Sequence, residues 1–145
     1  MPVKIESAAY NPFDIVQDYQ QQLEQRVGQG QYGAATIFIG SMRDFNEDHL
    51  VSNMTLEHYP GMTEASLESI CDEAKQQWPI QDVLIVHRVG EIIPNDTIVL
   101  VAVWSAHRAA AYDANRFIME ALKSRAPFWK KELTSNGEKW VERNT

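Results

Sequence analysis

Positively charged side chains gather in one stretch of an otherwise acidic chain. Residues Ser105–Glu132 hold six of the 13 Lys and Arg residues, together with His107, against three acidic residues. The other 117 residues carry seven basic and 17 acidic side chains, and the formal net charge is −7. A compact cationic site inside an acidic surface suits a small anionic ligand better than a polyanion, which the remaining surface would repel. We therefore expect a small anionic substrate, and no binding to nucleic acid or to an anionic membrane surface.

The elements that position these charges can be predicted from the sequence around them. The apolar, β-branched run Thr97–Trp104 predicts a buried strand. Ser105 is a candidate N-cap for a helix over Ala106–Ser124, which is rich in good helix formers. Pro127 ends that helix, because proline lacks the backbone donor and restricts the residue before it.

Two of the basic residues then lie at opposite ends of one helix. Arg108 begins it and Lys123 stands in its last turn, while Lys130 lies just beyond the proline. Fifteen residues at 1.5 Å each separate Arg108 from Lys123 by roughly 22 Å. One small ligand cannot contact both ends, so a site that uses both has to be shared between two copies of the chain.

His107, Arg108 and Arg43 are the candidates for binding a phosphate-like group. His107 and Arg108 stand at a strand-to-helix junction, where free backbone N–H groups favour anions. Structural or solvent-exposed roles fit these two residues about as well. Arg43 lies in the polar segment Ser41–Leu50, which we expect to be a mobile loop that could close over an anion.

Lys123 and Lys130 are the candidates for proton transfer. Neighbouring cations and the aromatic pair Phe128 and Trp129 would lower a lysine pKa, and such a lysine can act as an acid, a base or a nucleophile. The alternative is that both are ordinary solvated lysines near a helix C-terminus.

Two other motifs carry no chemistry of their own. Gly28–Gly33 (GQGQYG) matches a dinucleotide-binding pattern, but it follows a helix and precedes a strand, which is the wrong context, so we expect a turn. Cys71 lies on the apolar stripe of an expected helix, Thr63–Trp78, so it is expected to be a core thiol. Any sulfur chemistry would then need sulfur from another molecule. No histidine has metal-ligand spacing to another His or Cys, so no metal or cofactor is expected.

Length and composition favour one domain, residues 1–145, of ordinary globular type. No apolar run is long enough to span a bilayer, and the N-terminus lacks a signal-peptide pattern. With one cysteine and no internal disulfide, the expected location is the cytoplasm. Mixed helices and strands with a hairpin predict an α+β fold with a largely antiparallel sheet. The remaining expected elements are strands Val3–Ile5, Ala34–Gly40, Asn53–His58 and Val83–Val89, a helix Pro12–Val27 and a helix capped by Thr63, and a last strand or tail at Lys139–Arg143.

Four long segments, in this order, resemble one known family. They are LEHYPGMTE (Leu56–Glu64), HRVGEIIPNDTIV (His87–Val99), SAHRAAAYDA (Ser105–Ala114) and FIMEALKSRAPFWKKE (Phe117–Glu132). They closely resemble the large, catalytic subunit of molybdopterin synthase, the MoaE family, over about Ala34–Val141.

This resemblance implies a fold, a reaction and an assembly. The fold would be an α/β hammerhead with an additional small antiparallel sheet. The reaction, in molybdenum cofactor biosynthesis, would convert cyclic pyranopterin monophosphate into molybdopterin. Two sulfurs would come from the C-terminal Gly-Gly thiocarboxylate of a small ubiquitin-like sulfur-carrier subunit. The assembly would be a heterotetramer with a homodimer of this chain at its centre.

The resemblance also implies site residues. Lys123 and Lys130 would be catalytic. The positions that match the family's pterin site are Ser41, Met42, Arg43, His107, Arg108, Lys123, Lys130, Lys131 and Glu132. The family pattern has a basic residue where this chain has Ser41, so a backbone contact is expected there. Arg143 is shifted by one position from the family's basic residue and is left unassigned.

Two alternatives to a sulfur-transferring enzyme remain. The chain could be a non-catalytic module that binds a ubiquitin-like partner or a phosphorylated metabolite. Lys123→Ala would distinguish the two, because only an enzyme has turnover to lose. A phosphoesterase is a weak third candidate, since the sequence shows no metal cluster and no nucleophile constellation.

Overall fold

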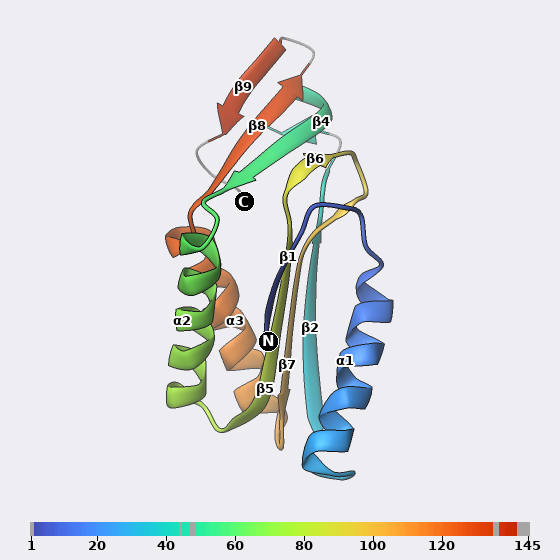
Figure 1. The fold of residues 1–145 in the computed structure, drawn as a ribbon, viewed down its shortest axis with the longest axis vertical. Helices are drawn as coiled ribbons and strands as arrows, with labels where there is room; N and C mark the ends of the chain where they lie inside the picture. The colour runs from blue at the N-terminus through green and yellow to red at the C-terminus, as the bar shows by residue number, and fades with distance from the viewer. Residues whose placement is uncertain (1, 44, 47–48, 135–136, 142–145) are drawn as a thin grey trace.

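The computed structural model describes residues 2–43, 45–46, 49–134 and 137–141. Within these ranges the chain folds into three helices and two sheets (Figure 1). The helices are α1 (Pro12–Val27), α2 (Met62–Gln77) and α3 (Arg108–Arg125). The larger sheet contains β1 (Val3–Glu6), β2 (Ala34–Ser41), β5 (Ile80–Arg88) and β7 (Thr97–Ser105). The smaller one contains β3 (Phe45–Asn46), β4 (His49–His58), β6 (Gly90–Ile92), β8 (Phe128–Thr134) and β9 (Gly137–Val141).

The larger sheet has the order β1-β5-β7-β2 and is covered on both faces. Alternate residues of its central strands point to opposite sides, as a pleated strand requires. Leu84 and Leu100 pack with Leu23 of α1, whereas Ile85 and Val101 belong to the core beneath α2 and α3. Figure 1 shows α2 and α3 together on one side of this sheet and α1 on the other.

The smaller sheet extends the molecule beyond one end of the larger sheet (Figure 1). Its main pairing is between antiparallel β4 and β8, and β9 returns along β8. The chain enters α2 from β4 and leaves α3 into β8, so the smaller sheet lies next to the C-terminal end of α3.

The α+β class, the largely antiparallel larger sheet and the additional small antiparallel sheet are confirmed. The strands expected at Val83–Val89 and Thr97–Trp104 correspond to β5 and β7, and they pair antiparallel as the hairpin of the predicted fold. The helix at Pro12–Val27 has the expected bounds, and β1 is an edge strand, paired parallel to β5.

Three local expectations are wrong. The polar segment Ser41–Leu50 was expected to be a loop, yet Phe45–Asn46 and His49–Leu50 pair as strands. Ser105 is the last residue of β7 and not the N-cap of α3; that position belongs to His107. The hydroxyl of Ser105 instead donates to the carbonyl of His107.

Thr63 does not cap α2 either. Gly61 is the N-cap, with φ +85°, and its N–H donates to the Glu64 carboxylate at 3.0 Å. Glycine adopts that backbone conformation without a side-chain penalty. Thr63 therefore lies inside the first turn, fully buried, and its hydroxyl is available for another contact.

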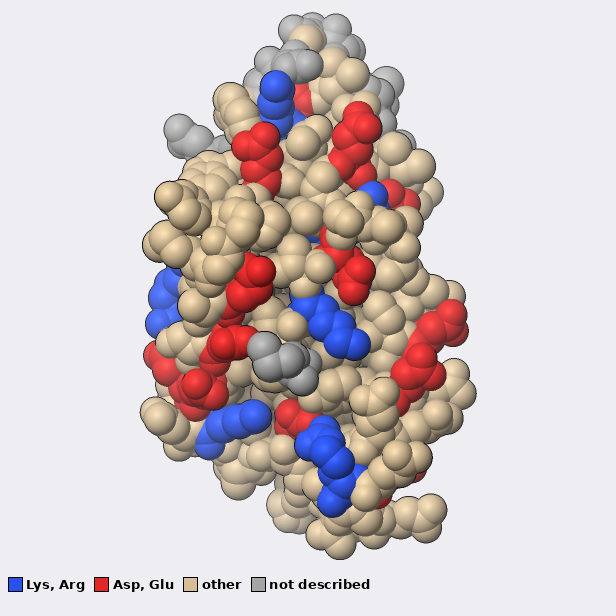
Figure 2. Space-filling view, in the orientation of Figure 1, with Lys and Arg blue, Asp and Glu red and all other residues tan. Residues whose placement is uncertain are grey.

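None of the helices in the described ranges is long and apolar enough to cross a membrane. Figure 2 shows acidic and basic side chains interspersed on one face of the molecule. That face therefore carries no broad surface of one sign, and the clustering of bases in the sequence does not become a wide cationic surface there.

Candidate functional site

The C-terminal end of α3 carries Lys123. The helix ends at Arg125 because Ala126, which precedes Pro127, has an extended backbone with ψ 133°. Lys123 reaches solvent in part, yet surrounding protein lowers the pKa of its ammonium group by removing water from it. A lysine with a lowered pKa gives up or takes a proton more readily near neutral pH.

A groove of about 810 Å³ runs between β2 and α3 and includes Lys123. Its walls are mostly apolar, with Phe38 and Met119 facing it from the two elements. Such a groove can bind an extended, largely apolar segment, with a cation available for an anionic group. The residues that line it are Ala35, Thr36, Ile37, Phe38, Tyr112, Asn115, Arg116, Met119, Glu120 and Lys123.

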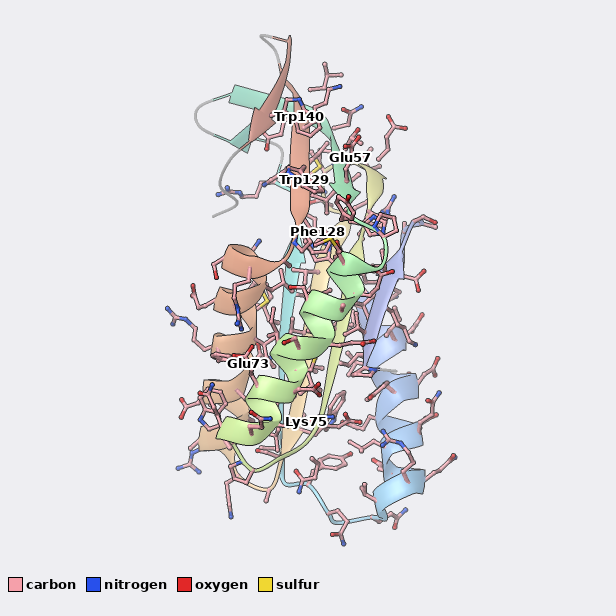
Figure 3. All side chains as sticks on the ribbon, turned by 60° about the vertical axis from the view of Figure 1, so that its left-hand side comes forward. Glu57, Glu73, Lys75, Phe128, Trp129 and Trp140 are labelled. Carbon is pink, nitrogen blue, oxygen red and sulfur yellow. The ribbon has the colours of Figure 1, made fainter. Side chains whose placement is uncertain are left out.

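Strand β8 places Lys130 inside the protein. Residues 128, 130 and 132 share one face of the strand, and both Lys130 and Glu132 are buried, with exposed fractions of 8% and 4%. Trp129, labelled on β8 in Figure 3, lies on the opposite face and is exposed. A lysine in a protein interior loses hydration free energy, so its charge has to be stabilised by other groups of the protein.

The segment after β2 holds the three predicted residues that precede the first gap. The backbone of Met42 is fixed by two hydrogen bonds: its N–H donates to Asp96 at 2.9 Å, and its carbonyl accepts from Asn95 at 2.9 Å. The Met42 side chain is buried in the core, whereas Arg43 is exposed. Ser41 lines a shallow hollow near the start of α1, on the side of the sheet away from α3. In this chain, then, Arg43 offers its side chain, and Ser41 and Met42 could reach the α3 side only through backbone atoms.

His107 and Arg108 lie at the other end of α3. Both are exposed, and no side chain caps the first turn of the helix. The 18-residue helix keeps them roughly 22 Å from Lys123. One chain therefore holds two separated groups of predicted site residues, Lys123 with the β8 residues at one end of α3 and the His107–Arg108 pair at the other. Their joint role in one site stays a prediction.

His87 was not among the predicted site residues, yet the structure places it beside the residue that begins β8. Its ring is 3% exposed and stacks on Phe128, with ring centroids 3.8 Å apart and an interplanar angle of 15°. Burial lowers its pKa to about 4, with smaller contributions from Lys123 and His58, so the ring is neutral at physiological pH. The spacing of residues could not predict this contact, because β5 and β8 are far apart in the chain and meet only in the fold.

Cys71 is a core thiol, as expected. It is buried beside Leu67 and Ala74, and burial raises its pKa to about 12. A thiol held in this protonated form is a poor nucleophile. Among the residues that the structure describes, no three His, Cys, Asp or Glu side chains are grouped to hold a metal ion.

Comparison with known proteins decides the family. The family model described as MoaE protein matches residues 9–125. The chain belongs to the MoaE family. Curated relatives in this family are named molybdopterin synthase catalytic subunit, and one from Ralstonia nicotianae is 56% identical over 117 residues, covering 81% of this chain and 66% of the relative.

Three further matches extend this assignment over more of the chain. The Escherichia coli relative of the same name is 47% identical over 131 residues, covering 90% of this chain and 85% of the relative. Among solved structures, a MoaE protein from Burkholderia ambifaria matches with a TM-score of 0.78 at 44% identity, covering 99% of this chain and 90% of that chain. Molybdopterin synthase from Staphylococcus aureus matches with a TM-score of 0.83 at 31% identity, covering 99% and 98%. The MoaE family fold is therefore the fold of this chain.

Proposed function

We propose that this MoaE-family chain is the catalytic subunit of a molybdopterin synthase. It would convert cyclic pyranopterin monophosphate into molybdopterin by two sulfur transfers, each from the thiocarboxylate of one small ubiquitin-like subunit, whose C-terminus is left as an ordinary carboxylate. The observation that carries the proposal is the pair of lysines on either side of Pro127. Lys123 has a lowered pKa beside an apolar groove, and Lys130 is buried on the next strand.

The groove between β2 and α3 suits the tail of a sulfur carrier. A C-terminal tail is extended, and its thiocarboxylate is an anion that needs a cation when it leaves water. Lys123 would neutralise that charge, and Lys123 and Lys130 would move protons as sulfur adds to the pterin side chain. Because the thiol of Cys71 is buried and protonated, it does not compete as the sulfur donor.

The phosphate of the substrate would be held by arginine and histidine side chains. Arg43 would approach from its own chain, whereas His107 and Arg108 are too far along α3 and would come from a second copy. Arg108 is suited to two parallel hydrogen bonds with phosphate oxygens. Lys131 and Glu132 would complete the site, together with backbone groups of Ser41 and the carbonyl of Met42, which can accept a second hydrogen bond.

The proposed assembly is a central dimer of this chain with one small sulfur-carrier subunit at each end, located in the cytoplasm. A solved structure of the same fold from Helicobacter pylori is a protein–protein complex of subunits 1 and 2 of molybdopterin-converting factor. That structure is 20% identical to this chain and matches with a TM-score of 0.81.

Reconstitution tests the proposal directly. The purified chain is mixed with a thiocarboxylated small subunit and the cyclic pterin, and the dithiolene product is measured. We expect product from the wild-type chain and none when the carrier ends in an ordinary carboxylate. Absence of product with authentic components would reject the enzyme in favour of a binding module.

A further inference from the structure

A turn of two residues joins the helix that carries Lys123 to the strand that carries Lys130. Ala126 and Pro127 connect α3 to β8, and we call residues Ala126–Phe128 the α3–β8 elbow. The elbow is tight: Ala126 N–H donates to Leu122 at 3.2 Å, and Phe128 N–H donates to Ala126 at 3.0 Å. The angle at this elbow sets where Lys130 stands relative to Lys123.

Thr63, in the first turn of α2, is hydrogen-bonded to the elbow. Its buried hydroxyl donates to the carbonyl of Pro127 at 3.1 Å and accepts from the N–H of Tyr59 at 3.0 Å. Tyr59 directly follows β4, the strand that pairs with β8. One hydroxyl thus ties the first turn of α2, the elbow and the end of β4 together.

His87, on β5 of the larger sheet, packs against Phe128 of the elbow. Its Nδ1 lies 2.9 Å from the carbonyl of Arg88, and because a carbonyl only accepts, Nδ1 carries the proton. This hydrogen bond fixes the plane of the ring, and the ring lies flat against Phe128. Figure 3 shows Phe128 at the lower end of β8, just above α2. With 3% of its surface exposed, His87 has no face free for a substrate.

We propose that Thr63 and His87 are positioning residues for sulfur transfer, which hold the α3–β8 elbow so that Lys123 and Lys130 keep a fixed separation. This inference rests on the proposed function. Proton transfer demands close placement of the groups, and a displacement of about 1 Å can cost about 100-fold in rate. Neither residue touches the reacting atoms; both act through the backbone and ring that they hold.

Two pairs of variants test the elbow in the reconstituted synthase. His87→Leu removes the flat ring and Thr63→Val removes the hydroxyl, and each is expected to lower kcat by roughly 10- to 100-fold, with KM for the pterin within about twofold of wild type. His87→Phe keeps a flat ring and Thr63→Ser keeps the hydroxyl. Both conservative variants are expected to retain kcat within about threefold.

Val83→Ala is the matched control. Val83 lies on the same face of β5 as His87 and is fully buried in the core. It stands four residues, roughly 13 Å, from His87 along the strand. We expect this variant to unfold more easily yet to keep kcat. Unchanged kcat in His87→Leu and Thr63→Val, or a loss no greater than in Val83→Ala at equal stability, would overturn the inference.

The crystal structure of His87→Leu tests the role of the elbow independently of the proposed function. A wild-type chain that makes no product would reject the proposed function alone. The elbow is then judged from the structure of His87→Leu, in which Lys130 should shift by about 1 Å or more relative to Lys123. An unchanged arrangement of the two lysines in that variant would overturn the role of His87.

Discussion

At the scale of the residue, environment distinguishes Lys123 from the many lysines on a protein surface. Partial burial lowers its pKa, and the neighbouring groove gives it access to a ligand. The sequence predicts a lowered lysine pKa from neighbouring cations and aromatic residues, whereas in the structure burial is what lowers the pKa of Lys123. The sequence does not reveal the groove, because β2 and α3 are brought together only by the fold.

Replacing Lys123 with alanine should remove turnover and leave binding intact. We expect product formation to fall by about 100-fold or more, the usual contribution of an acid–base group, while affinity for the small subunit stays within a few-fold. Lys75→Ala is the control, because Lys75 is an exposed lysine of α2 whose ion pair with Asp82 is long, at 3.9 Å. The amine of Lys123, followed by NMR, should titrate below the ordinary lysine value of about 10.4. Full activity of Lys123→Ala would exclude its catalytic role.

His87 should make the fold sensitive to acid. Its pKa is about 4 in the folded protein and about 6.5 when unfolded, so between these values the unfolded chain binds the extra proton. The free energy of unfolding should therefore fall as pH falls from about 6.5 to about 4, by roughly 1 to 3 kcal/mol. The charged groups that act on the ring, Lys123 from α3 and His58 from β4, both oppose its protonation.

Urea denaturation at a series of pH values measures this effect. His87→Phe removes the titrating ring. Its free energy of unfolding should therefore fall less than that of wild type between about pH 6.5 and about pH 4. The acid dependence that comes from carboxylates should be the same in both proteins. Parallel pH curves for wild type and His87→Phe would show that His87 does not cause the acid sensitivity.

At the scale of the element, the long helices and the buried strands were predicted well. Strand β7 is a nearly continuous apolar run, the middle of β5 is apolar, and α1 has apolar residues at helical spacing, so local preference agrees there with the final fold. Strand β8 was missed because its inward face carries Lys130 and Glu132 in place of apolar residues. Prediction of strands from hydrophobic patterning assumes that polar side chains face solvent. It fails at β8 because charged side chains are buried there, in the candidate site.

Capping was also mispredicted for a physical reason. Thr63 has the residue type of an N-cap, but Gly61 takes that position because Glu64 satisfies its N–H and glycine accepts the positive φ. The hydroxyl of Thr63 donates instead to the carbonyl of Pro127, 64 residues away in the chain. Contacts of such long sequence separation cannot be read from local propensity.

Asn115 fixes α3 to the larger sheet, and its removal should loosen that element. Its side-chain amide donates to the carbonyls of Thr36 and Val101, each at 3.1 Å, in a buried position. Asn115→Ala should lower the free energy of unfolding by about 1 to 3 kcal/mol, since it takes a donor away from buried carbonyls. A lower urea midpoint with an unchanged m-value would support this, with Arg116→Ala on the exposed face as the control near wild type. An Asn115→Ala variant as stable as wild type would contradict it.

At the scale of the whole molecule, the decisive feature is the length of α3. One helix separates the predicted phosphate-binding pair, His107 and Arg108, from Lys123 by more than any small substrate can span. In a twofold dimer each site would take Lys123 from one subunit and Arg108 from the other. A shared site of this kind can be tested by an activity assay on mixed variants, without a structure of the dimer.

Mixing two inactive variants should restore activity. In a heterodimer of Lys123→Ala with Arg108→Ala, one shared site carries both defects and the other carries neither. Random exchange of subunits makes about half of the dimers mixed, so about a quarter of the wild-type product rate should return. The two variants are unfolded and refolded together and then assayed with the small subunit and the pterin, and the same variants refolded apart serve as controls. If Lys123 and Arg108 acted within one chain, no combination of subunits would contain an intact site, and the refolded mixture would stay as inactive as its components.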